Sequence, residues 1–313
     1  MFTTYKELKE IHEQIKPYIH KTPVLTSQSY NRISHCSAYF KCENFQKMGA
    51  FKMRGALNAI LNLNESERKK GVTTHSSGNF AQAVSLSARI LGIPATVIMP
   101  STAPEVKKNA VRSYGATVIE CEPKLESRVR TTEDFSNKTG AVILHPSDQK
   151  EVIDGNASAC LELLEEVPDL EAIITPVGGG GLLAGTALAA KAINPLIKIY
   201  AGEPMAADDA YRSLKKGTIQ PSINPHTIAD GLKTQLGENN FPIIQKYVDE
   251  IIRVEEDEII TAMKWVWQRM KIIIEPSSAV PVAAIWKKNK YFKAKKTGII
   301  ISGGNVELEK LPF

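Results

Sequence analysis

The chain has 313 residues, of which 43% are hydrophobic and 23% are charged, and its formal net charge is +5. This length and composition fit one large globular domain or two closely joined ones. The charge is mild for a chain of this size, so we expect no nucleic-acid partner.

The cysteines and the first residues of the chain restrict the class of protein further. The four cysteines are far apart and form no CxxC pair, and the six histidines are scattered. This spacing favours reduced thiols over a zinc site or a disulfide framework. The first twenty residues carry acids and no apolar core, which is unlike a signal peptide. No apolar run approaches the length that crosses a membrane, so we expect a cytoplasmic protein without a membrane partner.

Short apolar, β-branched runs alternate with helical patterns along most of the chain. The predicted buried strands lie at 95–100, 116–120, 141–146, 172–177, 198–203 and 297–302. The predicted helices lie at 79–92, 103–115, 155–167 and 182–193. Such repetition predicts an α/β fold with parallel-rich sheets flanked by helices. We expect residues 70–147 to form a small domain, and residues 1–69 and 148–313 to form a large one.

The stretch GAFKMRGA, residues 49–56, raises the first question about chemistry. It places Lys52 between Phe51 and Met53. A lysine with apolar neighbours on both sides is either a surface residue that snorkels or an amine held in a pocket.

The segment THSSGNFAQA, residues 74–83, leads into the predicted helix at 79–92. The hydroxyls of Ser76 and Ser77, with the backbone N–H groups around Gly78 and Asn79, suit a carboxylate at a helix start. The alternative is ordinary N-cap and turn chemistry. The segment alone does not choose between these interpretations.

The strongest local signal is TPVGGGGLLAGTALAA, residues 175–190, where a predicted strand runs into four glycines and then a helix. The glycines are Gly178, Gly179, Gly180 and Gly181. Residues without a Cβ let backbone N–H groups converge at a helix N-terminus, which predicts a phosphate cradle. A flexible turn is one alternative. A dinucleotide fingerprint is another, with Glu203 as its acid, but it leaves Lys52 unexplained.

Three acids lie close together in GEPMAADDAYRSLKKG, residues 202–217. Glu203, Asp208 and Asp209 suit Mg²⁺ or Ca²⁺ together with backbone carbonyls. Acids at a helix start are more often partners of the helix dipole.

Two segments near the C-terminus add polar groups at the ends of apolar runs. Glu275 follows three isoleucines, so burial would be costly unless the carboxylate has a partner. Ser302 ends the predicted strand at 297–302, where its hydroxyl either donates to a buried heteroatom or belongs to a turn. The basic segment 287–296 is interpreted as a solvated helix end or loop.

Taken in order, these pieces resemble the fold-type II pyridoxal-phosphate enzymes, and within them the serine racemases and the serine/threonine dehydratases. The similarity covers nearly the whole chain. It includes the segments ENFQKMGAFKMRGA, SSGNFAQA, IADGLKTQLG and WVWQRMKIIIEPSSAV.

The resemblance implies a role for each segment. Lys52 matches the lysine that binds the cofactor as a Schiff base and removes the Cα proton, and Ser77 matches the acid/base hydroxyl of the opposite face. Asn79 matches the residue at the ring hydroxyl, and Ser302 the residue at the ring nitrogen. The implied cofactor-binding residues are Phe51, Lys52, Asn79, Gly178, Gly179, Gly180, Gly181, Leu182, Glu275 and Ser302. The implied substrate-binding residues are Ser76, Ser77, Gly78 and Asn79.

The resemblance also implies a reaction, a metal and an assembly. We expect a dehydratase that converts serine, threonine or 3-hydroxyaspartate to a 2-oxo acid and ammonia. An amino-acid racemase with side elimination, a β-replacement enzyme and a non-catalytic nucleotide-binding protein remain alternatives. A structural divalent cation, Mg²⁺ or else Ca²⁺ or Mn²⁺, is implied at Glu203, the Ala207 carbonyl and Asp209. Relatives imply a homodimer.

Overall fold

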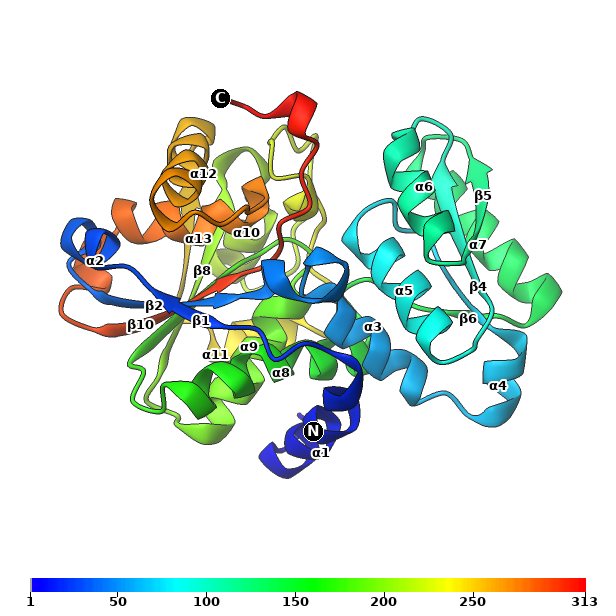
Figure 1. Ribbon diagram of the computed structural model, residues 1–313, viewed down its shortest axis with the longest axis horizontal. Coiled ribbons are helices and arrows are strands. Elements are labelled where there is room, and N and C mark those ends of the chain that lie inside the picture. The colour runs from blue at the N-terminus through cyan, green and yellow to red at the C-terminus, as the bar shows by residue number, and fades with distance from the viewer. Residues whose placement is uncertain (1) are drawn as a thin grey trace.

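The computed structural model describes residues 2–313 and contains two β-sheets flanked by helices (Figure 1). The larger sheet has six strands in the order β1-β2-β10-β7-β8-β9, and the smaller has four in the order β5-β4-β3-β6. Every neighbouring pair is parallel except β1 with β2. The predicted α/β fold with parallel-rich sheets is confirmed.

The strands of the larger sheet come from both ends of the chain. They are β1 (Val24–Thr26), β2 (Ser37–Cys42), β7 (Ala172–Pro176), β8 (Lys198–Pro204), β9 (Glu250–Val254) and β10 (Lys296–Ile301). The strands of the smaller sheet are β3 (Val72–Thr74), β4 (Ala95–Pro100), β5 (Thr117–Cys121) and β6 (Val142–Ile143).

Helices connect the strands and cover both sheets. In the first half of the chain they are α1 (Tyr5–Ile15), α2 (Gln28–Ser34), α3 (Lys52–Leu61), α4 (Glu65–Lys70), α5 (Asn79–Ile90), α6 (Glu105–Ser113) and α7 (Leu125–Thr139). In the second half they are α8 (Lys150–Glu166), α9 (Gly181–Ile193), α10 (Asp209–Lys216), α11 (Phe241–Tyr247), α12 (Glu256–Met270) and α13 (Pro276–Lys287).

The predicted strands and helices are all present, most within two residues of their expected ends. Two differ more. The run at 141–146 pairs as a strand only at Val142–Ile143, after which the chain turns toward the other sheet. The helix predicted at 155–167 begins earlier, at Lys150, where its first two turns contact the N-terminal segment: Lys150 donates to Thr3 Oγ1, and Thr3 donates to Asp154.

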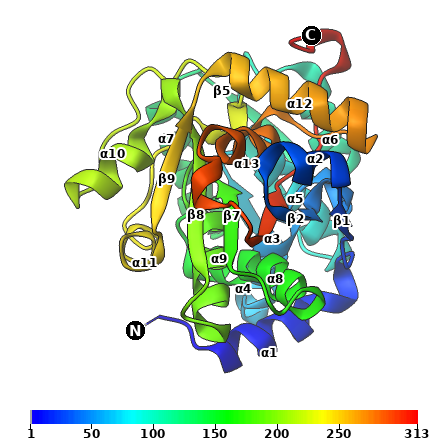
Figure 2. The same cartoon turned by 90° about the vertical axis from the view of Figure 1, so that its left-hand side faces the viewer.

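Alternating strand residues build two cores on opposite faces of the larger sheet. Ile173 and Ile300 join the core formed with α8 and α9, whereas Ile174 and Ile299 join the core formed with α12 and α13. Figure 2 shows these helix pairs on either side of the strands. Strands buried on both faces explain the nearly continuous apolar runs in the sequence.

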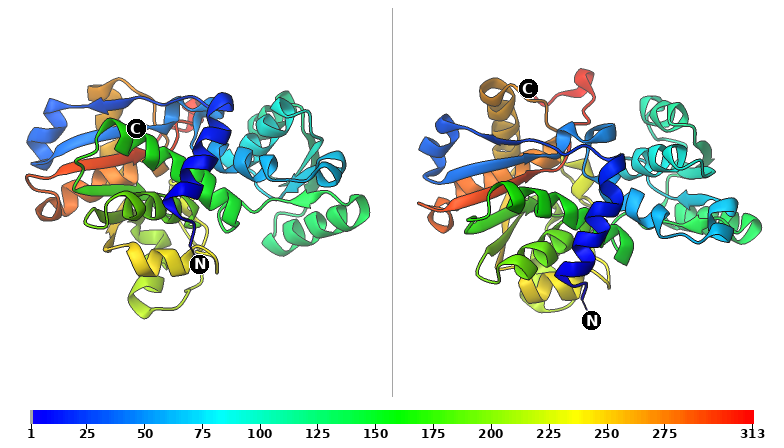
Figure 3. Two further views of the ribbon diagram at one scale, coloured as in Figure 1. Left: turned by 90° about the horizontal axis from the view of Figure 1, so that it is seen from below. Right: turned by 60° about the horizontal axis from the view of Figure 1, so that its bottom comes forward.

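Helix α3 lies between the two sheets and packs on both sides. It contacts α8 of the larger unit and α5 of the smaller one, and α1 crosses beneath the same junction (Figure 3). The contact with α8 is close because two glycines face each other: a Cβ on Gly155 would lie 2.9 Å from the Cα of Gly55. The first residue of α3 is Lys52, so this junction positions the lysine.

None of the helices among residues 2–313 is long and apolar enough to cross a membrane.

Candidate active site

The site lies where the carboxyl ends of strands from both sheets meet the start of α3. Parallel α/β sheets bind ligands at this edge, because the loops and helix N-termini converge there. The larger sheet contributes the loop after β7 and the loop after β10. The smaller sheet contributes the segments after β3 and β6.

The Lys52 side chain is half-buried, and its amine lies against aromatic rings and backbone. Its Nζ lies 5.0 Å from the ring centroid of Phe51 and 5.6 Å from that of Phe80, and it donates to the Pro146 carbonyl at 2.6 Å. Desolvation lowers the pKa of the Lys52 amine to about 8, although the negative charge of Glu275 opposes this shift. A substantial fraction of the amine is therefore neutral and nucleophilic near pH 8.

The segment before Lys52 is fastened to the end of β10. The Phe51 N–H donates to the Ser302 carbonyl at 2.9 Å, and Ala50 bridges Gly303. The Gly304 N–H donates to the Gly49 carbonyl at 2.9 Å. These backbone contacts hold the segments of Lys52 and Ser302 side by side, although the two residues are 250 positions apart in the sequence.

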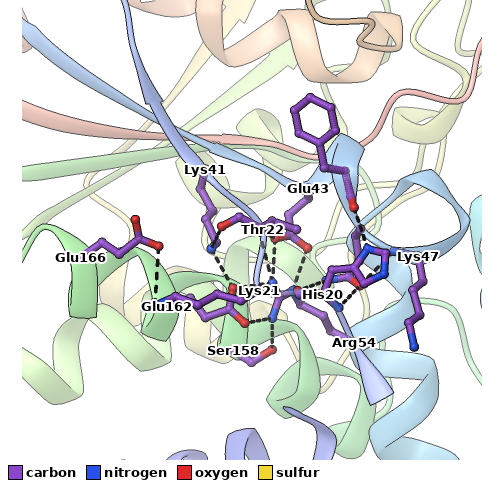
Figure 4. Close-up of polar contacts among 12 residues, drawn as sticks. His20, Lys21, Thr22, Lys41, Glu43, Lys47, Arg54, Ser158, Glu162 and Glu166 are labelled. Carbon is purple, nitrogen blue, oxygen red and sulfur yellow. Dashed lines mark hydrogen bonds and ion pairs between the residues drawn. The ribbon is translucent and has the colours of Figure 1, made fainter. Parts of the chain in front are cut away.

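A buried ion-pair cluster holds α3 from the other side. We call Lys41, Glu43, Arg54 and Glu162 the Arg54 cluster (Figure 4). Arg54 donates to Glu43 Oε2 at 2.7 Å from Nε, and to both Glu162 oxygens at 2.8 Å from Nη1 and Nη2. Since Arg54 is two residues from Lys52, bonds that join α3 to α8 and to Glu43, just after β2, fix the helix turn that carries the amine.

The four glycines lie at the N-terminus of α9, where the sequence predicts a cradle. Gly180 has φ +86°, in the left-handed region, so a side chain there would strain the backbone. A Cβ on Gly179 would lie 2.4 Å from Ser147 Oγ, and one on Gly178 would lie 2.7 Å from the Leu232 Cα. The start of α9 leaves its first N–H groups free of intrahelical partners. The geometry suits an anion.

Two residues that sequence reasoning missed support this cradle. Asn240 donates to the Gly179 carbonyl at 2.8 Å and to the Ser147 carbonyl at 3.2 Å. Ser147 lies against the glycines from the segment that follows β6. Its position after the predicted strand at 141–146 was a usable signal, because segments after parallel strands meet at one edge. Asn240 had no comparable local signal.

The Ser76–Asn79 segment opens α5 on the opposite wall of the site. The Gly78 N–H contacts Ser76 Oγ at 3.3 Å, and a Cβ on Gly78 would meet no atom within 4 Å. Open space at a helix N-terminus leaves room for a substrate carboxylate. Both serines are half-buried.

Asn79 connects this wall to Glu275. Its side-chain nitrogen lies 3.1 and 3.0 Å from the two Glu275 oxygens, and Asn305 donates to its oxygen at 2.9 Å. Burial raises the pKa of the Glu275 carboxyl to about 7, and the hydrogen bond from Asn79 opposes the shift. Glu275 thus has the partner that its position after an apolar run required.

Two histidines outside the sequence-based prediction adjoin the segments of the site: His75 precedes Ser76, and His145 precedes Pro146, whose carbonyl accepts from Lys52. His75 and His145 pack edge to face with ring centroids 6.2 Å apart. Burial lowers the pKa of both imidazoles, and the charge of Arg128 lowers that of His75 further. The backbone N–H groups of Ser147 and Asp148 donate to His145 Nδ1, at 3.3 and 2.8 Å, so a neutral His145 carries its proton on Nε2.

The predicted metal residues lie between the end of β8 and the start of α10. The Glu203 oxygens accept from the backbone N–H groups of Ala210 and Tyr211, both at 2.8 Å. Asp209 Oδ2 is buried without a hydrogen-bond partner, and burial raises the pKa of Asp209 to about 6. No group of three or more His, Cys, Asp or Glu side chains suited to a metal ion occurs within residues 2–313.

Comparison with known proteins gives one family and close relatives. Residues 15–303 match the family model described as pyridoxal-phosphate dependent enzyme. A serine racemase of Dictyostelium discoideum is 53% identical over 98% of this chain and 96% of its own length, and its crystal structure superposes with a TM-score of 0.94.

Two further relatives have different activities. A beta-hydroxyaspartate dehydratase of Paracoccus denitrificans is 44% identical over 99% of this chain and 98% of its own length. A threonine deaminase of T.th., known from its crystal structure, is 38% identical, with a TM-score of 0.93, over 98% of this chain and 99% of that one.

Proposed function

This chain belongs to the family of pyridoxal-phosphate-dependent enzymes, and from that premise we propose that it is a dehydratase of β-hydroxy amino acids. The proposed substrates are serine, threonine and 3-hydroxyaspartate, and the products are a 2-oxo acid and ammonia. The single observation that carries the proposal is the Lys52 amine, whose pKa is lowered to about 8 and which donates to the carbonyl of Pro146, the residue before the Ser147 that packs against the glycines.

The residues of the site fit the cofactor. Phosphate suits the cradle of Gly178–Gly181 and Leu182, because the N-terminus of α9 favours an anion, and side chains on these glycines would collide with the residues packed against them. Asn79 and Glu275 would hold the ring oxygen, and Ser302 the ring nitrogen. When bound, pyridoxal phosphate supplies an aldehyde that joins amino groups and a ring that accepts electrons from the adjacent carbon.

Different residues of the chain then bind the substrate, move its proton and shield the amine. The N–H groups and hydroxyls of Ser76–Asn79 bind the substrate carboxylate and orient the Cα–H bond. The Lys52 amine takes the Cα proton at Nζ. The β-hydroxyl leaves as water with a proton that balances the one taken from Cα, which restores the neutral amine. One water then hydrolyses the released enamine to the 2-oxo acid and ammonia. The rings of Phe51 and Phe80 lie beside the amine and shield part of it from water.

The second candidate is amino-acid racemisation. It is supported by Ser77, which the resemblance matches to the acid/base hydroxyl that returns a proton to the opposite face, and by the 53% identity with a serine racemase. Two acid/base groups on opposite faces are what inversion requires.

A direct experiment tests the shared chemistry. Protein reconstituted with pyridoxal phosphate is reduced with borohydride and mapped by mass spectrometry. We expect the adduct on Lys52, none in Lys52→Ala, and a loading rate that rises with pH through about 8, because only the neutral amine reacts. An adduct on another lysine refutes the proposal. Assaying 2-oxo acids and D-isomers from L-serine, L-threonine and L-threo-3-hydroxyaspartate then ranks the two activities.

We also propose a structural Mg²⁺, or Ca²⁺ or Mn²⁺, at Glu203, the Ala207 carbonyl and Asp209. The unpartnered Asp209 Oδ2 and the costly burial of two acids support it, since a cation would stabilise both carboxylates. EDTA should lower the unfolding temperature, Mg²⁺ should restore it, and Asp209→Asn should abolish the response. A temperature that EDTA leaves unchanged refutes the site.

Three broader features complete the proposal. The small domain comprises residues 70–147, and the large domain residues 1–69 and 148–313. The protein acts in the cytoplasm as a homodimer. Sedimentation velocity of the loaded enzyme tests the assembly, and a monomer at micromolar concentration refutes it.

A further inference from the structure

Behind Ser302 lies a second buried serine on another element. Ser302 follows β10 and Ser278 lies in the first turn of α13, with exposed fractions of 2% and 0%. Their hydroxyl oxygens are 2.9 Å apart. Ser278 Oγ also lies 2.8 Å from both the N–H and the carbonyl oxygen of Gly303.

The number of protons restricts how these groups pair. The Gly303 N–H can only donate, so Ser278 Oγ accepts it. Ser278 has one proton left, for either the Gly303 carbonyl or Ser302 Oγ. The Gly303 carbonyl already accepts from the Glu275 N–H at 3.0 Å. Ser302 Oγ can therefore receive the Ser278 proton without leaving that carbonyl unpaired.

The choice determines what Ser302 offers to the site. If Ser278 donates to Ser302, the Ser302 proton is free to point outward and Ser302 becomes a donor. In the opposite arrangement Ser302 donates inward and presents only lone pairs. A neutral hydroxyl cannot hold a proton on a pyridine nitrogen as a carboxylate would, so a donor is the better match for that nitrogen.

We propose that Ser278 is a positioning residue that makes Ser302 a hydrogen-bond donor toward the ring nitrogen of the cofactor. The donors run in one direction, from the Gly303 N–H to Ser278 and from Ser278 to Ser302. Aligned hydrogen bonds in a buried chain polarise one another, which strengthens the last donor. The inference rests on the proposed function, because it takes Ser302 to face the ring.

The test uses Ser278→Ala, with Ser277→Ala as its matched control. Ser277 is in the same helix turn and 2% exposed, but its hydroxyl has no hydrogen-bond partner among the described residues. We expect Ser278→Ala to bind pyridoxal phosphate about tenfold more weakly, the loss of roughly one buried hydrogen bond. Ser277→Ala should bind like the wild type.

A spectroscopic measurement separates this role from a merely structural one. With cofactor labelled by ¹⁵N at the ring nitrogen, the wild type should give the shift of an unprotonated, hydrogen-bonded nitrogen. Ser278→Ala should move it toward a nitrogen without a donor. Ser278→Cys keeps the size of the side chain with a weaker donor, so it should give an intermediate shift even if the alanine variant folds poorly.

The outcomes that overturn the inference are specific. A protonated ring nitrogen in the wild type refutes it, as does a Ser278→Ala shift equal to that of Ser277→Ala. If borohydride fixes the cofactor to Lys52 while either result is found, only the role of Ser278 fails. If no adduct forms on Lys52, the proposed function itself fails.

Discussion

The two walls of the candidate site are held by ion pairs of opposite character. The Arg54 cluster, which fixes the α3 wall to the larger sheet, is 0–2% exposed. On the smaller sheet's side, Lys107 of α6 lies 3.0 Å from Asp230 and 3.9 Å from Glu307, where the three side chains are 28%, 57% and 27% exposed. These are the only ion pairs within residues 2–313 that join residues 72–143 to the rest of the chain.

The difference follows from the dielectric surroundings of each charge. Removing one partner from a buried pair leaves a charge without water, whereas a charge freed at the surface is solvated. The wall that carries Lys52 is therefore rigid. On the side of Ser76–Asn79, the exposed ion pair of Lys107 can open at low cost, whereas the buried packing of α5 on α3 and the hydrogen bonds between Asn79 and Glu275 remain.

The largest effect is expected from Glu162→Ala, which leaves two buried cations, Arg54 and Lys41, with one carboxylate between them. Breaking such a pair costs about 3–5 kcal/mol in the free energy of unfolding. Urea unfolding measures it. The control is Glu166→Ala in the same helix, whose pair with Lys21 spans 3.9 Å at the surface and should cost under about 1 kcal/mol. Equal losses would contradict the comparison.

A second prediction concerns acid stability. Burial raises the pKa of Glu162, but hydrogen bonds and charges from Arg54 and Lys41 outweigh it and bring the pKa to about 2. A folded-state pKa below the unfolded value stabilises the protein above the unfolded pKa, and this stability is lost as the pH falls. Between about pH 4.5 and pH 2 the wild type should lose of order 3 kcal/mol through this group.

The variant Glu162→Gln isolates that contribution. It keeps the size of the side chain but cannot ionise, so its free energy of unfolding should fall less steeply with acid than that of the wild type. The two stability curves, measured by urea unfolding at each pH, should converge toward pH 2. Parallel curves would show that Glu162 has no depressed pKa.

Sequence reasoning succeeded where the signal is local. The β-branched runs identified six strands and the glycine run identified the turn before α9, because periodicity and missing side chains act within a few residues. The pairing of β2 with β10 was not predictable in this way, since it joins residues 37–42 to residues 296–301. The Arg54 cluster was missed for the same reason: its charges resemble ordinary surface residues until the fold buries them together.

The residues of the candidate site differ in the same way, because some have a local signal in the sequence and others do not. Lys52, Gly178–Gly181 and Ser302 have local signals, and their roles remain predictions that the experiments above test. Ser278 and Asn240 support their neighbours through contacts across 24 and 61 residues of sequence, which no local pattern encodes. Glu275 is intermediate: its need for a partner was evident, but the identity of Asn79 as that partner came from the fold.

The smallest effect is expected from Lys107→Met, which removes the exposed contact between the walls. Asp230 precedes Gly231 and Leu232, whose backbone lies against Gly178, and Glu307 follows the segment of Asn305, which holds Asn79. The pair thus connects α6 to supports of both the cradle and the substrate loop. Since the ion pair of Lys107 with Asp230 is partly exposed, its loss should change the free energy of unfolding by less than about 1 kcal/mol.

Enzyme kinetics should detect the loss of the Lys107 ion pair, even where the free energy of unfolding hardly changes. A coupling of up to about 1 kcal/mol corresponds to at most about a fivefold rise in KM at low salt, with a smaller effect on kcat. High salt screens the wild-type pair, so the difference in KM between the two proteins should shrink as ionic strength rises.

The control is Arg112→Met on the same helix, because Arg112 pairs with Glu105 of α6 itself. If Arg112→Met raises KM equally, net charge rather than the contact between the walls is responsible. If the double variant Lys107→Asp with Asp230→Lys has the KM of the wild type, the contact itself is responsible. The reversed pair keeps the attraction, although the charges at positions 107 and 230 both change sign.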